Sequence, residues 1–235
     1  MKTNRFLLAA GIALAMAFTF SCSGGGGDDG GGGNNGNGGG GGGGGYTGSY
    51  GSVKDAAGKS YKTVKIGTQT WMAENLNYDP GTGKSACYDN QASNCATYGR
   101  LYDWETAMEV CPSGWHLPSD AEWTVLTDYV GDNAGTKLKA TSGWDDYNTY
   151  LNGMTSGNGT NSYGFSALPG GYTYYSSSSY FYSTSVGNYG YWWSATEDNS
   201  NSGGPYFRNM RNTDSDVGRG SHFGFNIYSV RCVQD

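Results

Sequence analysis

The alternation of hydrophobic and polar positions predicts a β-hairpin near residue 67. Residues 61–66 alternate in polarity, with Val64 and Ile66 on the same face. Gly67 and Thr68 then supply a short turn into a second run, residues 69–73. We therefore expect two antiparallel strands here.

Helical spacing follows between residues 101 and 130. Residues 101–110 carry apolar side chains at intervals of three and four, which predicts a first helix that ends at Cys111. Ser119 and Glu122 have the spacing of a capping box, and an apolar stripe continues behind them. Gly131 is a natural stop, so a second helix is predicted up to Val130.

Beyond residue 131, Gly, Ser, Asn and Tyr dominate, and helical signals fade. Short strands are predicted over residues 191–196, 206–211 and 225–233. In the last segment the apolar parity changes between Ile227 and Val230. That strand is therefore either buried on both faces or bulged near Ser229.

The N-terminus has the pattern of a secretion signal, assigned to residues 1–21. Lys2 and Arg5 precede an uncharged, mostly apolar run over residues 6–20. This run is shorter than the roughly 20 residues that a membrane-spanning helix needs. The small residue before Cys22 resembles a bacterial lipoprotein cleavage site, which predicts Cys22 as a lipidated mature N-terminus and the membrane as a partner through that anchor.

Composition separates a tether, residues 22–49, from one domain, residues 50–235. Residues 23–45 of the tether are almost entirely glycine with a few Asp, Asn and Ser, and they have no apolar side chains to offset the entropy of ordering. Removal of residues 1–21 takes away two basic residues and no acidic one, so the formal charge changes from −6 to −8. Without a basic stripe, no nucleic-acid partner is predicted.

The four cysteines of the domain indicate a disulfide framework in an exported protein. Three pairings are open, and we favour Cys87 with Cys95 and Cys111 with Cys232. The histidines, His116 and His222, are isolated, and no CxxC pair exists, so a zinc site is not expected.

Six ordered blocks resemble the Fibrobacter succinogenes major paralogous domain: 65–77, 98–104, 111–123, 164–171, 191–197 and 229–233. The resemblance implies a fold similar to C-type-lectin-like domains and to the formylglycine-generating, sulfatase-modifying enzymes. It implies an α+β domain with two early helices, short antiparallel strands, a long loop-rich C-terminal half, and terminal strands paired in one sheet.

Aromatic residues crowd the segment 172–193 and suggest a platform for sugar rings. The candidate ligand-binding residues are Tyr174, Tyr175, Tyr180, Tyr182, Trp192, Trp193, Glu197, Arg208 and Arg211. The alternative is that the aromatic rings pack the core of a leucine-poor domain.

The charged candidate residues also have alternative, non-functional interpretations. The three arginines Arg208, Arg211 and Arg219 have the chemistry to bind a carboxylate, although the sequence favours simple solvation at the surface. Glu197, with Asp214 and Asp216, has oxygen ligands suited to calcium, but the lectin sugar-site triplets are absent, so no metal and no cofactor is predicted.

The sequence thus predicts a lipid-anchored, non-catalytic module on the bacterial outer membrane that binds a polysaccharide or a surface protein. No nucleophile and base are marked, and His116 is expected to make a structural hydrogen bond near Cys111. The alternatives are a structural envelope protein without a discrete site and an unrecognised enzyme on a sulfatase-modifying-factor-like scaffold.

Overall fold

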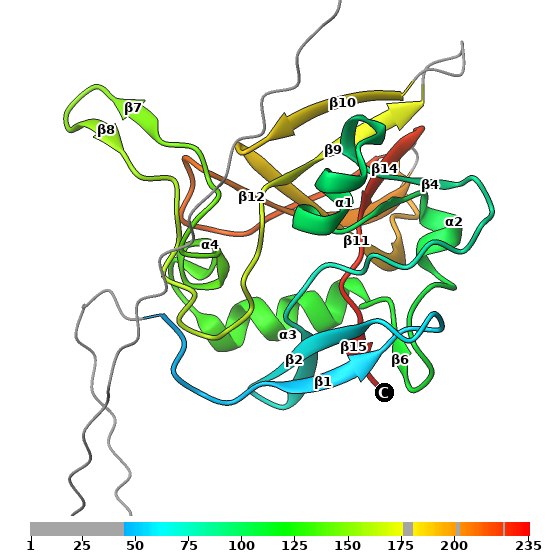
Figure 1. Ribbon diagram of the computed structural model, residues 1–235. Helices are drawn as coiled ribbons and strands as arrows, with labels where there is room; N and C mark the ends of the chain where they lie inside the picture. Colours follow the sequence, from blue (N-terminus) through cyan, green and yellow to red (C-terminus); the bar gives the residue numbers. More distant parts are fainter. Residues whose placement is uncertain (1–44, 176–180, 201–202, 223) are drawn as a thin grey trace, which may run out of the picture. The chain divides into compact units, whose positions relative to one another are not determined.

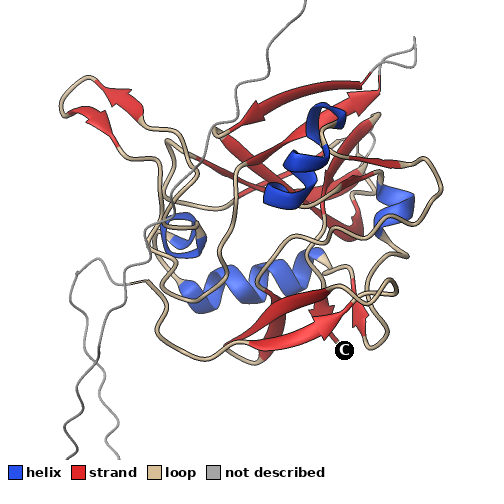
Figure 2. Cartoon of the chain, in the orientation of Figure 1, coloured by secondary structure: helices blue, strands red, loops and turns tan. Residues whose placement is uncertain are grey.

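The computed structural model describes residues 45–175, 181–200, 203–222 and 224–235, and it builds them into a mixed α+β domain (Figures 1 and 2). The smaller sheet has the order β1 (Gly51–Lys54), β2 (Ser60–Ile66), β3 (Gln69–Met72), β15 (Val233–Gln234) and β6 (Trp115–His116). The larger sheet has the order β13 (Gly218–Ser221), β12 (Pro205–Arg211), β11 (Tyr189–Glu197), β9 (Gly170–Tyr175), β14 (Asn226–Ser229), β5 (Leu101–Tyr102) and β4 (Ser85–Ala86), and β10 (Phe181–Val186) pairs with β9.

The remaining elements lie around these sheets. They are a separate hairpin, β7 (Tyr147–Thr149) and β8 (Gly153–Thr155), a 3-10 turn η1 (Tyr88–Asn90), and the helices α1 (Ala92–Tyr98), α2 (Trp104–Ala107), α3 (Asp120–Val130) and α4 (Ala134–Leu138).

The predicted hairpin and the terminal strand pairing are both confirmed. Strands β2 and β3 are antiparallel, with Ile66 opposite Gln69 across the tight turn. At the other end of the chain, Val233 of β15 pairs with Trp71 of β3. The first and last strands of the domain therefore share one sheet.

Helix α3 begins and ends as its sequence predicts, and it forms the centre of the core. The Ser119 hydroxyl accepts from the Glu122 amide at 3.2 Å, and the Glu122 carboxylate accepts from the Ser119 amide at 2.8 Å. Trp123 is fully buried and meets Trp71 of β3 at 4.8 Å and Trp192 of β11 at 6.5 Å between ring centroids. Because its apolar side contacts both sheets, α3 packs between them (Figure 1).

The helix expected over residues 101–110 is wrong at both ends, because only α2, Trp104–Ala107, is helical there. Leu101 and Tyr102 form β5, where Tyr102 pairs with Tyr228 of β14. The helix α2 starts only after Asp103, whose side chain accepts from the Thr106 amide at 2.8 Å. Pairing with a distant strand thus overrides the local helical spacing.

The C-terminal segment is two strands in two sheets. Strand β14 ends at Ser229 in the larger sheet, and β15 starts at Val233 in the smaller one. The parity change in the sequence therefore marks a crossing between sheets. The loop-rich half is likewise more ordered than expected, because much of residues 170–221 forms β9–β13.

Buried Arg231 lies in this crossing and joins three parts of the chain, and Asn75 connects a fourth. Its guanidinium donates to the Asn75 side-chain oxygen at 2.8 Å, to the Ser166 carbonyl at 2.8 Å and to the Phe165 carbonyl. The same Asn75 oxygen accepts from the Trp192 indole at 2.9 Å. Burial lowers the pKa of Arg231 to about 9, against the raising effect of Glu74, so the group stays charged at neutral pH.

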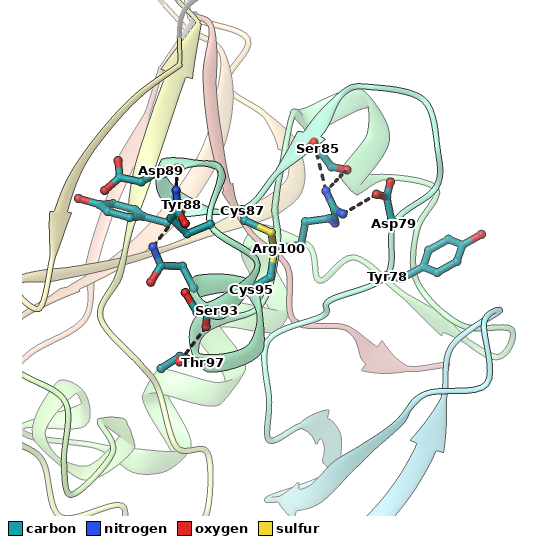
Figure 3. Close-up of a disulfide and its surroundings, with 12 residues drawn as sticks. Tyr78, Asp79, Ser85, Cys87, Tyr88, Asp89, Ser93, Cys95, Thr97 and Arg100 are labelled. Carbon is teal, nitrogen blue, oxygen red and sulfur yellow. Dashed lines mark hydrogen bonds and ion pairs between the residues drawn. A yellow bond between two sulfur atoms is a disulfide. The ribbon is translucent and has the colours of Figure 1, made fainter. Parts of the chain in front are cut away.

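Both favoured disulfides are present. Cys87 bonds Cys95 across 8 residues and ties η1 to α1, beside Arg100 and its partners Asp79 and Ser85 (Figure 3). Cys111 bonds Cys232 across 121 residues and fastens the sheet crossing to the chain after α2.

We expect Cys232→Ser to destabilise the domain more than Cys87→Ser. On the chain-entropy model the long loop contributes about 5 kcal/mol and the short loop about 2.5 kcal/mol. Chemical unfolding of both variants against wild type measures the difference. Equal losses would show that loop length does not govern the two bonds.

His116 has the structural role expected of it, in a pair of ion contacts. Its Nδ1 lies 2.7 Å from the Asp235 carboxylate and its Nε2 lies 2.8 Å from that of Glu122. Burial alone would lower the pKa of His116, but the hydrogen bonds and charges of Asp235 and Glu122 outweigh it and raise the pKa.

This raised pKa predicts a pH dependence of stability. The stabilisation is complete below the unfolded pKa of about 6.5 and is lost as the pH rises through the higher folded value. When the pH is raised from mildly acidic to mildly alkaline, the midpoint of unfolding should therefore decrease. The decrease should be larger in wild type than in His116→Gln. Parallel pH profiles for the two proteins would contradict this role.

Candidate functional site

The face of the larger sheet that points away from α3 carries a connected group of aromatic rings. Side chains alternate along a strand, so Trp192 and Met210 point into the α3 core and their neighbours point the other way. The rings on this second face, which we call the tyrosine face, are Tyr172, Tyr174, Tyr182, Tyr189, Tyr191, Phe207 and Tyr228.

The rings touch in sequence from an exposed end to a buried end. Tyr174 and Tyr182, opposite each other on β9 and β10, stack at 5.6 Å and are 39% and 52% exposed. Tyr191 stacks on Tyr228 at 5.0 Å, and Tyr228 is only 3% exposed. Burial raises the pKa of Tyr191 to about 12, so its hydroxyl keeps its proton and is able to donate.

A glycine in the edge strand β13 provides the space that the Phe207 ring of this face occupies. Gly220 lies opposite Phe207, and a Cβ on Gly220 would stand 2.6 Å from the Phe207 ring. The aromatic ring therefore lies over glycine backbone. A side chain at this position would displace the ring and narrow the face.

A cleft of about 490 Å³ adjoins the buried end of the tyrosine face. Trp193, on its wall, packs against Tyr228 at 4.3 Å between ring centroids, and the Asn226 amide donates to the Tyr228 hydroxyl at 3.0 Å. The lining residues are Lys84, Asp103, Trp104, Glu105, Trp193, Glu197, Pro205, His222, Gly224, Phe225 and Asn226.

Two acidic groups of the cleft are engaged within the protein. Asp103 caps α2, as described above. Glu105 pairs with Lys84 at 2.8 Å, and the hydrogen bond and charge of Lys84 lower the pKa of Glu105. Glu105 is therefore an ionised acceptor, which is the opposite of the protonated state that a general acid needs.

Several predicted site residues come together here. Tyr174 and Tyr182 form the exposed end of the tyrosine face, and Glu197 lines the cleft. The Arg211 guanidinium lies over the Tyr189 ring at 4.8 Å, so it covers part of the same face. Tyr180, the Tyr175 side chain and Cys22 lie outside the described parts of the structure.

The two tryptophans are corrections to the predicted platform. Trp192 is fully buried on the opposite face of the sheet, where its indole bonds Asn75. Trp193 is 2% exposed and donates to the Tyr102 carbonyl at 2.7 Å, so it contributes a cleft wall and no open ring. Both rings pack in the core, which agrees with the alternative interpretation that the aromatic residues fill the core of a leucine-poor domain.

Arg208 is the third correction. It is 3% exposed and pairs with the Asp120 carboxylate at 2.7 Å. Arg219 meets the same carboxylate at 3.0 Å. The carboxylate that these arginines bind is therefore one of the protein's own, at the start of α3, and Arg208 is not accessible to a ligand.

Sequence reasoning missed Phe207, Trp104 and Phe225. The alternation of β12 gives a signal for Phe207, which shares the parity of Asn209 and Arg211 opposite β11. Trp104 and Phe225 meet at the cleft because β5 and β14, which are far apart in the sequence, pair with each other. No local sequence pattern predicts such a long-range contact.

Within residues 45–235, excluding the undescribed gaps, no group of three or more His, Cys, Asp or Glu side chains is arranged to hold a metal ion. Among those same residues, no helix has the length and apolar character required to cross a membrane.

Comparison with known proteins identifies one family. A family model described as the Fibrobacter succinogenes major domain matches residues 64–234. No curated protein and no solved structure matches the chain.

Proposed function

The chain belongs to the Fibrobacter succinogenes major domain family, and we propose that it is a lipid-anchored, non-catalytic module of the cell surface that binds a polysaccharide. The observation that carries this proposal is the tyrosine face, with stacked Tyr174 and Tyr182 exposed at its open end.

The physical basis is the match between aromatic faces and sugar rings. The apolar C–H surface of a sugar packs against the ring of a tyrosine, and the hydroxyl adds a polar contact. Neighbouring rings hold each other, since Tyr172 meets Tyr174 at 6.4 Å and Tyr191 at 5.1 Å. A face that is already ordered loses little side-chain entropy when a ligand binds.

The cleft favours a neutral polysaccharide. Glu105 and Glu197 offer acceptors for sugar hydroxyls, while Trp104 and Phe225 add apolar surface. Without residues 1–21 the formal charge is −8, so an anionic sugar would meet an unfavourable field. A neutral chain that lies along the tyrosine face and ends in the cleft fits both features.

Export and anchoring complete the proposal. The two disulfides support an oxidising compartment outside the cytoplasm. The lipid on Cys22, the outer-membrane location and the C-type-lectin-like class of the fold rest on the sequence and on the family resemblance.

We expect Cys22→Ser to leave the chain unprocessed or soluble. Loss of the acceptor thiol removes the acyl chains that would hold the protein stably at a bilayer. Fractionation of cells that produce the two proteins, with intact mass of the membrane-extracted wild type, provides the measurement. A wild-type mass without acyl groups would remove the anchor from the proposal.

The binding role is tested at the exposed end of the tyrosine face. Tyr174→Ala and Tyr182→Ala should each raise the Kd for a neutral polysaccharide about tenfold, the equivalent of ~1.4 kcal/mol for a lost ring contact. Both variants should unfold close to the wild-type temperature, because these rings are the most exposed of the face.

Tyr129→Ala is the matched control, since Tyr129 is 58% exposed on α3 and also contacts another ring, that of Tyr163. A panel of neutral plant and bacterial polysaccharides in affinity electrophoresis and calorimetry supplies the ligands. Absence of binding across the panel would favour a structural envelope protein, and release of reducing sugar would favour an enzyme.

A further inference from the structure

The hairpin β7–β8 projects from the domain (Figure 1). Its end carries exposed apolar side chains. Tyr150 is 103% exposed, Leu151 is 87% exposed and Met154 is 68% exposed. The tyrosine face and the cleft do not include any of these residues. We propose that this hairpin tip inserts into the interfacial region of a lipid bilayer.

The composition of the tip fits a lipid surface. Residues 147–155 contain no Asp, Glu, Lys or Arg, so insertion buries no charge. Tyrosine is enriched where hydrocarbon meets water, and leucine and methionine supply apolar area below that level. The two strands are paired from Tyr147 with Thr155 to Thr149 with Gly153, which satisfies the backbone groups that the strands turn toward each other.

The base of the hairpin is fixed to the domain. The Asp145 amide donates to the Gly187 carbonyl at 2.9 Å, and its carboxylate accepts from Asn188 at 3.1 Å. In the segment after β8, the side-chain oxygen of Asn158 accepts from the Trp144 amide at 3.0 Å. The tip is therefore presented by a rigid support, with exposed Asp145 and Asp146 limiting how deeply it enters.

The chain enters the domain beside this base, which places a tethered membrane within reach. A Cβ on Gly45 would lie 3.8 Å from Thr141, and the Tyr46 amide donates to the Asn161 carbonyl at 3.1 Å. Gly45 follows Cys22 by 23 residues in the sequence, so a lipid on Cys22 would keep this base within about 80 Å of the bilayer. The extended hairpin from Asp145 to Tyr150 is about 17 Å long, so anchor and tip can reach one bilayer together.

Environment-sensitive fluorescence tests the insertion without relying on the anchor. The mature chain, residues 22–235, with Cys22→Ser and Leu151→Cys is labelled with NBD and mixed with phosphatidylcholine vesicles at millimolar lipid. The emission should shift to the blue, and Tyr150→Asp in the same chain should reduce the partition coefficient about tenfold through the loss of buried apolar area. Phosphatidylglycerol vesicles should bind less, because Asp145 and Asp146 meet a negative surface.

Val125→Cys is the matched label site, at an exposed apolar residue on α3 that should stay in water. Equal emission from the two labelled chains, with and without vesicles, would overturn the proposal. Dimers that form without lipid and that Leu151→Asp disrupts would show that a second copy occupies the tip, and would also overturn it. Neither result bears on polysaccharide binding by the tyrosine face.

Discussion

The domain depends on one buried cation, Arg231, held at the crossing between its two sheets. A guanidinium out of water costs several kcal/mol unless its donors are satisfied, and among the described residues no carboxylate is in hydrogen-bond contact with this one. Carbonyls of Phe165 and Ser166 and the side chain of Asn75 accept its bonds instead. The Phe165 ring also lies 4.3 Å from the guanidinium carbon. Three segments distant in sequence must therefore arrive together for the chain to fold.

This arrangement connects the frame of the domain to the tyrosine face. Asn75 shares its oxygen between Arg231 and Trp192, so β11 is fixed at its core side by the same network that holds the sheet crossing. Strand alternation then places Tyr191 on the outer side of β11, against Tyr228. The order of the outer rings is thus a consequence of polar bonds in the core, and the Cys111–Cys232 bond adds a covalent link one residue from Arg231.

Local sequence patterns predict the parts of the fold that depend on interactions between nearby residues. The capping box predicts the start of α3, and the parity change near Ser229 indicates a break in the last strand. The helix expected at Leu101 fails because a two-residue stretch pairs with β14, and α1 has a polar sequence without an apolar stripe. Such pairings depend on residues more than a hundred positions away.

The candidate site divides in the same way. The aromatic composition of residues 172–193 is enough to predict Tyr174 and Tyr182 as exposed site residues. The same segment includes Trp192, however, which is buried in the core. Arg208 illustrates the limit for charges, since its partner Asp120 is contributed by a different element. Burial and pairing of such residues are properties of the assembled sheets, and composition cannot separate a platform from a core.

The central claim is that the tyrosine face contacts sugar, and ring-proton NMR of tyrosine-labelled protein tests it most directly. Titration with soluble fragments of a neutral polysaccharide should shift the resonances of Tyr174, Tyr182 and Tyr191, and should leave Tyr129 unchanged. Shifts confined to tyrosines outside this face, or none at saturating ligand, would contradict the account.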